Sequence, residues 1–81
     1  MGADSSRPFP PAVVFEESSS LANAAYDNSR KLLQIEFRDR SVYRYASVPT
    51  GAYIDLLAAD SKGNYFNTRI RNRYPHRKIR S

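Results

Sequence analysis

The chain has 81 residues, no cysteine, one histidine and a formal net charge of +5. This length allows one small domain, and the lack of cysteine excludes disulfides and thiolate zinc sites. No run approaches the roughly twenty apolar residues of a transmembrane helix, and the first residues lack a signal-peptide pattern. We therefore expect a soluble, cytoplasmic protein without membrane, metal or cofactor binding, and we assume a monomer.

The positive charge is concentrated toward the C-terminus. Residues 61–81 carry seven basic side chains and no acidic one, whereas residues 1–60 carry six basic and eight acidic side chains. A surface of one sign attracts a partner of the opposite sign, and nucleic acid is the commonest polyanion in a cell. The charge split therefore indicates a binding surface.

Residues 1–17 resemble a flexible tail, because Pro8, Pro10 and Pro11 interrupt regular strand pairing. The short apolar run at residues 13–15 allows a second interpretation, in which it covers a sheet edge.

Residues 18–75 are expected to form one domain that begins with three strands. Residues 21–26 suit a short strand, and residues 31–37 alternate, with Leu33, Ile35 and Phe37 on the apolar side. Residues 41–45 are rich in strand-forming side chains. The turns between these segments are short, which predicts an antiparallel meander.

Two helices are predicted next. Thr50 can cap a helix that ends near residue 58, and Ser61 can cap a second helix over about residues 62–72, with Phe66 and Ile70 on its inner face. Pro75 prevents continuation, and residues 76–81 are expected to be a basic tail. The predicted fold class is α+β, with a three-stranded antiparallel β-meander followed by two α-helices packed on one face.

The first candidate surface lies on the second helix. Arg69 and Arg73 are one helical turn apart, Arg71 points roughly the opposite way, and Lys62 lies beside the apolar stripe. Arginine forks bind phosphate oxygens, and each neutralised phosphate releases a counterion. The alternative is a solvated face whose arginines pair with nearby carboxylates.

The second candidate is the run of Tyr43, Arg44 and Tyr45, whose two rings project to the same face of a strand. Exposed rings would stack unpaired bases, whereas buried rings would belong to the core. A two-residue turn places them on the polar face of the preceding strand, and a one-residue bulge places them with Leu33 and Ile35. We favour burial of at least one ring, because a small domain needs aromatic burial.

The third candidate is an anion site at the start of the second helix, where Ser61 and Gly63 flank Lys62. Free backbone N–H groups attract anions there, and the alternative is an ordinary serine cap. The carboxylates are scattered without a base or nucleophile partner, and His76 lies in the basic tail. We therefore expect no enzymatic activity.

These residues together resemble the KTSC domain, a family found C-terminal to some lysyl-tRNA synthetases and as free-standing small bacterial proteins. The resemblance covers about residues 18–75 and is carried by Tyr26-Asp27, Leu33 to Phe37, Val42 to Tyr45, Val48-Pro49, Ser61 to Asn67, Ile70-Arg71 and Tyr74-Pro75. It implies a small α+β module, and the synthetase attachment implies RNA binding. It supplies no catalytic residue. Asp39-Arg40 departs from the Asn-Gly-like turn that is typical of the family, which leaves the register open.

The expected function is a small non-catalytic module that binds RNA, or another polyanion, through its basic C-terminal helix. The alternative is a protein-interaction module that docks an acidic partner through the apolar N-terminal segment or a sheet edge.

Overall fold

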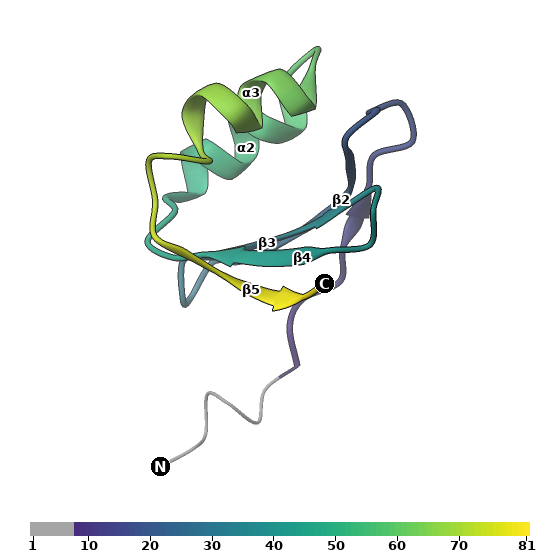
Figure 1. Cartoon of the computed structure of the whole chain (residues 1–81). Helices are drawn as coiled ribbons and strands as arrows, with labels where there is room; N and C mark the ends of the chain where they lie inside the picture. Colours follow the sequence, from purple (N-terminus) through teal and green to yellow (C-terminus); the bar gives the residue numbers. More distant parts are fainter. Residues whose placement is uncertain (1–7) are drawn as a thin grey trace.

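The computed structural model describes residues 8–81, in which a five-stranded antiparallel sheet carries two helices on one face (Figure 1). The strands are β1 (Val13–Val14), β2 (Leu21–Asp27), β3 (Leu32–Phe37), β4 (Val42–Tyr45) and β5 (His76–Arg80), in that order across the sheet. The helices α2 (Thr50–Ala58) and α3 (Lys62–Arg69) lie in the connection between β4 and β5. The α+β class is confirmed.

The expected three-stranded meander followed by helices is wrong, because a further strand lies on each side of it. β1 pairs with β2 at one edge of the sheet, and β5 pairs with β4 at the other. Every residue of β5 is exposed, so no apolar alternation marks this segment as a strand, and its charges suggest a tail instead. β1 is only two residues long, but it covers the sheet edge and leads to Phe15, which is buried in the core.

The hairpin between β3 and β4 determines which face carries the tyrosines. Its loop spans residues 38–40 and is closed by a backbone hydrogen bond of 2.9 Å. Arg40 has a φ of 78°, the left-handed conformation that ends a three-residue hairpin loop. Leu33 consequently lies opposite Tyr45, and Ile35 opposite Tyr43, which is the arrangement that a bulged turn predicts.

The core lies between the sheet and the helices. β3 contributes Leu33 and Ile35, α2 contributes Leu56, and α3 contributes Phe66; each is 2% exposed or less. The ring of Phe66 meets that of Tyr45 edge-to-face, with centroids 5.3 Å apart. Sheet and helices are therefore joined by aromatic contacts as well as by aliphatic packing.

The opposite face of the sheet is covered by neither helix, and we call it the open face (Figure 1). By the strand register it carries the side chains of Asn23, Ala25, Asp27, Leu32, Gln34, Glu36, Val42, Arg44, Arg77 and Arg80. Most of these are polar or charged, as expected of a face that borders solvent.

Helix α3 is shorter than the sequence predicts. Ser61 caps it, since its Oγ accepts a hydrogen bond from the backbone N–H of residue 64. Two successive backbone N–H groups then donate to the carbonyl oxygen of Phe66, and the helix ends at Arg69 rather than near residue 72. Arg71 and Arg73 follow in the turn toward β5. Arg69 and Arg73 are therefore not one turn apart on a common helix.

Candidate nucleic-acid interface

The two tyrosines of β4 have different roles. Tyr45 is 3% exposed and belongs to the core, and burial raises the pKa of its phenol. Tyr43 is only half-buried, and its ring meets Phe37 edge-on with centroids 5.8 Å apart. Of these two tyrosines, Tyr43 is therefore the one whose ring is accessible for stacking.

Tyr43 borders a hollow of about 670 Å³ between the C-terminal part of α3 and the helix-side face of the sheet, which we call the α3–β4 groove. Its lining comprises Ser20, Leu21, Phe37, Arg38, Asp39, Ser41, Tyr43, Tyr45, Phe66, Asn67, Arg71, Asn72 and His76. Three of the predicted site residues, Tyr43, Tyr45 and Arg71, thus come together here. This groove combines an aromatic ring, amide groups and positive charge.

Arg71 lines the groove near Tyr43, and two side chains of β5 lie close to the tyrosine ring. Arg71 donates a hydrogen bond to Oδ1 of Asn67 at 3.3 Å. From β5, the Lys78 ammonium lies 5.8 Å from the Tyr43 ring centroid, and the His76 ring lies 5.7 Å from it. Sequence reasoning missed Lys78 and His76 as site residues, because it treated their segment as a tail.

The other charged residues that line the α3–β4 groove, Arg38 and Asp39, form hydrogen bonds within the adjoining loops. Arg38 donates to the backbone oxygens of Phe15 and Ser18, at 2.6 and 3.0 Å. Asp39 is the one acidic residue in the lining. Hydrogen bonds from Ser41 lower the pKa of Asp39 and keep its carboxylate ionised. With Arg38 and Arg71 against Asp39, the lining of the groove carries a net positive charge.

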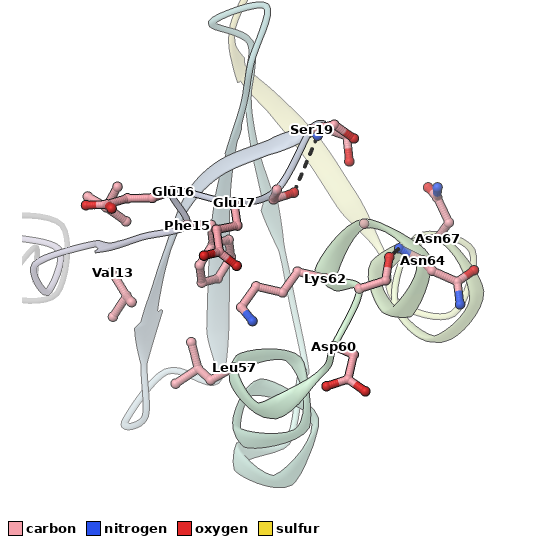
Figure 2. Close-up of a pocket in the computed structure, with 15 residues that line it drawn as sticks. Val13, Phe15, Glu16, Glu17, Ser19, Leu57, Asp60, Lys62, Asn64 and Asn67 are labelled. Carbon is pink, nitrogen blue, oxygen red and sulfur yellow. Dashed lines mark hydrogen bonds between the residues drawn. The ribbon is translucent and has the colours of Figure 1, made fainter.

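The start of α3 borders a different hollow, of about 840 Å³, between this helix and the N-terminal segment of residues 13–20. Figure 2 shows Lys62 extending toward Phe15, and its ammonium lies 5.6 Å from that ring. The ammonium also donates to the backbone oxygen of residue 59 at 2.9 Å. The carboxylates of Glu16, Glu17 and Asp60 line the same hollow. Three negative groups against one positive group make it a poor anion site.

Ser61 and Gly63 have structural roles at this helix start. Ser61 is the cap described above, so the alternative interpretation of this residue fits the structure. A Cβ atom added to Gly63 would lie 2.5 Å from Oγ of Ser20. Glycine is needed there for the close approach of α3 to the loop before β2.

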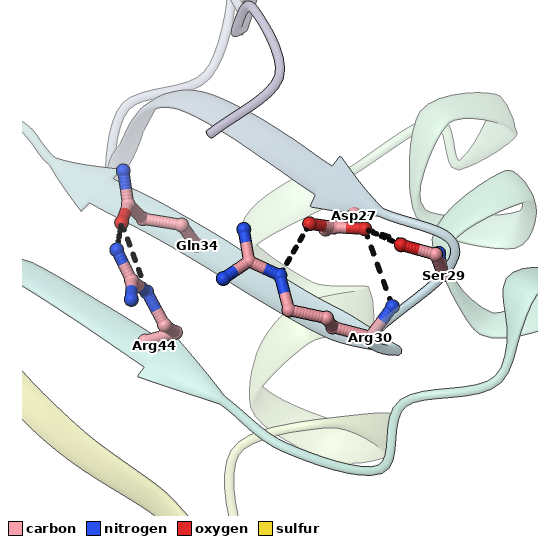
Figure 3. A network of polar contacts seen from close by, with 5 residues as sticks. All are labelled: Asp27, Ser29, Arg30, Gln34 and Arg44. Carbon is pink, nitrogen blue, oxygen red and sulfur yellow. Dashed lines mark hydrogen bonds and ion pairs between the residues drawn. The ribbon is translucent and has the colours of Figure 1, made fainter. Parts of the chain in front are cut away.

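The other predicted phosphate-binding residues lie outside the α3–β4 groove. Arg69 is exposed beside the ring of Tyr65, 5.9 Å from its centroid, and Arg73 is exposed in the following turn. Arg44 points to the open face, where its guanidinium donates to Oε1 of Gln34 (Figure 3). The basic residues that the sequence predicts to bind phosphate therefore lie on separate surfaces.

Among the residues that the structure describes, most cations of the C-terminal region form no ion pair with a carboxylate. Residues 8–81 contain two ion pairs, Arg30 with Asp27 and Arg80 with Glu36. Within the same residues, no group of three or more His, Asp or Glu side chains could hold a metal ion, and no helix is long and apolar enough to cross a membrane.

Comparison with a solved structure and with bacterial proteins shows a shared fold and a related sequence. A KTSC domain protein from Yersinia pestis superimposes with a TM-score of 0.81 at 32% identity, over 85% of this chain and 96% of that chain. An uncharacterized protein from Stutzerimonas stutzeri is 43% identical over 51 residues, which are 63% of this chain and 72% of the relative. A protein from Tsukamurella paurometabola is 36% identical over 72% of this chain and 87% of its own length.

The chain also matches part of a much larger protein. A lysine–tRNA ligase from Nostoc punctiforme is 38% identical over 58 residues, which are 72% of this chain but 10% of the ligase. The family model of the KTSC domain matches residues 17–74. The chain therefore belongs to the KTSC domain family.

Proposed function

We propose that this domain is a non-catalytic module that binds single-stranded RNA in the α3–β4 groove. The observation that carries the proposal is the half-buried ring of Tyr43 in the groove that Arg71 also lines, with the Lys78 ammonium 5.8 Å from that ring. Aromatic stacking combined with a positively charged groove is the usual means of binding unpaired nucleic acid.

Each of these groups has a defined part in the proposed complex. A base stacks on Tyr43, a contact worth about 1–3 kcal/mol. Arg71 and Lys78 pair with the flanking phosphates and release counterions. Asn67 also lines the groove; its Oδ1 accepts from Arg71, and its Nδ2 is available as a donor to a base edge. Stacking and phosphate contacts are largely independent of base identity, so weak sequence preference is expected.

Similarity to segments of lysine–tRNA ligases supports RNA over DNA as the ligand, because tRNA stands in the name of those relatives. The positive charge of α3 and β5 supports a polyanion in general, because within residues 8–81 Arg80 is the one cation of these two elements that forms an ion pair. The groove replaces the predicted helix face of Arg69 and Arg73 as the proposed contact surface.

The test is the affinity for a labelled single-stranded RNA of about ten nucleotides, within the site sizes known for single-strand binders. Fluorescence anisotropy is measured over a salt series. Tyr43→Ala should weaken binding by about 5- to 150-fold, the equivalent of one lost stacking contact. Thermal unfolding should show a folded variant, because the Tyr43 ring lies at the rim of the core.

Arg71→Ala and Arg69→Ala form a matched pair, because each removes one positive charge and only Arg71 lines the groove. Arg71→Ala should weaken binding and reduce the salt slope by about one, whereas Arg69→Ala should have little effect. Equal losses for the two variants would show general charge attraction without a site. Absence of binding at about 50 mM salt would refute nucleic-acid binding altogether.

A further inference from the structure

Two arginines lie side by side on the open face, at the edge of the sheet away from β1. Arg44 of β4 and Arg77 of β5 are direct partners in the antiparallel register. Opposed residues have Cβ atoms roughly 5 Å apart, and like charges in this position repel each other. Within residues 8–81, neither guanidinium forms an ion pair with a carboxylate. An anion between them would remove this repulsion.

Arg44 is held in a fixed position that leaves part of its guanidinium available. Its Nε and Nη2 donate to Oε1 of Gln34 at 3.2 and 2.7 Å, as Figure 3 shows. The ring of Phe9 lies 4.7 Å from its central carbon. Two of the five N–H donors of an arginine are thus used, and the others remain for a ligand. A cation that is already ordered loses little entropy on binding.

A third guanidinium lies close to these two arginines, and its own charge is balanced by Asp27. Arg30 lies along the open face between its own partner, Asp27, and the pair formed by Arg44 and Gln34 (Figure 3). Burial lowers the pKa of Arg44, and the positive charges of Arg30 and Arg77 lower it further. These effects agree with a crowded group of cations.

A hollow of about 350 Å³ adjoins the two arginines and has an apolar floor. Its lining consists of Leu32, Arg44, Ala46, Pro75, His76 and Arg77. This volume is at the lower end of the range of small-molecule sites, about 300–1,000 Å³. A site with an apolar floor and two guanidinium groups suits a ligand that has both an apolar body and an oxyanion.

We infer that this open-face hollow binds a small oxyanion, a carboxylate or a phosphate monoester, attached to an apolar ring. The oxyanion pairs with Arg44 and Arg77, since guanidinium forks bind two oxygens at once. The ring covers Leu32 and Pro75. The hollow and the α3–β4 groove share only His76 among their lining residues, and the two arginines lie outside the groove, so this inference does not depend on RNA binding.

The test is a titration of the full chain, monitored by ¹⁵N-labelled amide signals, with four probes. Phenyl phosphate and benzoate carry an oxyanion on a ring, phenol carries the ring alone, and inorganic phosphate carries the oxyanion alone. We expect saturable shifts at residues 32, 44 and 77 with phenyl phosphate or benzoate, and weaker binding of the other two probes. If phenyl phosphate binds more tightly than benzoate, the site prefers a phosphate monoester, and the opposite order indicates a carboxylate.

Two variants on β5 separate a site from general attraction. Arg77→Gln should weaken binding of the preferred probe about tenfold or more, because it removes a charge-assisted pair. Arg80→Gln makes the same change of charge near the other end of the strand, beside Glu36, and should leave affinity unchanged. The inference is overturned if both variants lose affinity equally, if the probes shift the α3–β4 groove instead, or if no probe saturates.

Discussion

Substitution of Phe15 by alanine should destabilise the domain strongly, although this residue precedes the region that the sequence predicts to be folded. Its ring is 3% exposed. Its backbone N–H donates to Ala22 at 2.9 Å, and its carbonyl accepts from Arg38 at 2.6 Å. The segment is therefore held by backbone bonds on both sides of the buried ring.

The expected loss follows from the cavity that the ring would leave. Replacing a buried phenylalanine by alanine costs about 3–5 kcal/mol in well-packed cores. The Phe15 ring borders the hollow shown in Figure 2, so water can enter the vacated space. We therefore expect the lower end, about 3 kcal/mol, which is a large part of the 5–15 kcal/mol typical of a whole domain.

The assay is urea unfolding followed by circular dichroism, with Val14→Ala as the control. Val14 is the neighbouring residue and is 64% exposed, so its substitution should change stability by no more than about 0.5 kcal/mol. If Phe15→Ala unfolds at the same urea concentration as Val14→Ala, the N-terminal segment is not part of the core and the reasoning is wrong.

Three further predictions concern the stability of the domain. A Cβ added at Gly63 would lie 2.5 Å from Oγ of Ser20, so Gly63→Ala should destabilise the domain. In a double-mutant cycle, its cost in unfolding free energy should be smaller by at least about 0.5 kcal/mol when Ser20→Ala has removed that oxygen. Additive effects of the two substitutions would contradict the close approach. Arg40→Gly should stabilise the domain by about 1 kcal/mol in chemical denaturation, because glycine adopts the φ of 78° without strain; a destabilised variant would contradict this. Hydrogen bonds from Arg30 and Ser29 lower the pKa of Asp27 from 3.8 to about 2, so the folded state binds this proton less readily than the unfolded chain. The stability that Asp27 contributes should be intact above about pH 4 and should disappear as the pH falls toward 2; Asp27→Asn should flatten this part of the pH profile, and an unchanged profile would refute the assignment.

The central strands and the start of α3 could be predicted because their signals are local. The alternation around Leu33 and Ile35 predicts β3, and Ser61 at a helix start predicts the cap that the structure contains. The order of the predicted strands and helices indicated the α+β class, and the family resemblance implied the same class. These features depend on neighbouring residues only, so the sequence is sufficient to identify them.

The sequence allowed an edge-covering role for residues 13–15 only as a second interpretation, and it did not predict β5, whose pairing partner β4 is far away in the sequence. β5 shows no apolar alternation, and it is a strand because β4 offers it a free edge after the chain returns from α3. Its position brings Lys78 beside Tyr43 and Arg77 beside Arg44. Both proposed sites therefore depend on a strand that the sequence does not reveal.

The position of the tyrosines depends on one residue of the β3–β4 loop. The left-handed conformation of Arg40 lengthens the loop to three residues and turns Tyr43 and Tyr45 toward the helices. A non-glycine residue gives no clear sign of this conformation. The sequence therefore allowed both registers, and the structure contains the one that buries Tyr45.

The most direct test of the proposed function is to map the contact surface of a single-stranded RNA by amide chemical shifts of the full chain at low salt. The account predicts that the largest shifts occur at Tyr43, Arg71 and Lys78, and that Tyr43→Ala removes them. The proposal would be contradicted by shifts concentrated at Arg69 and Arg73 that leave the α3–β4 groove unchanged.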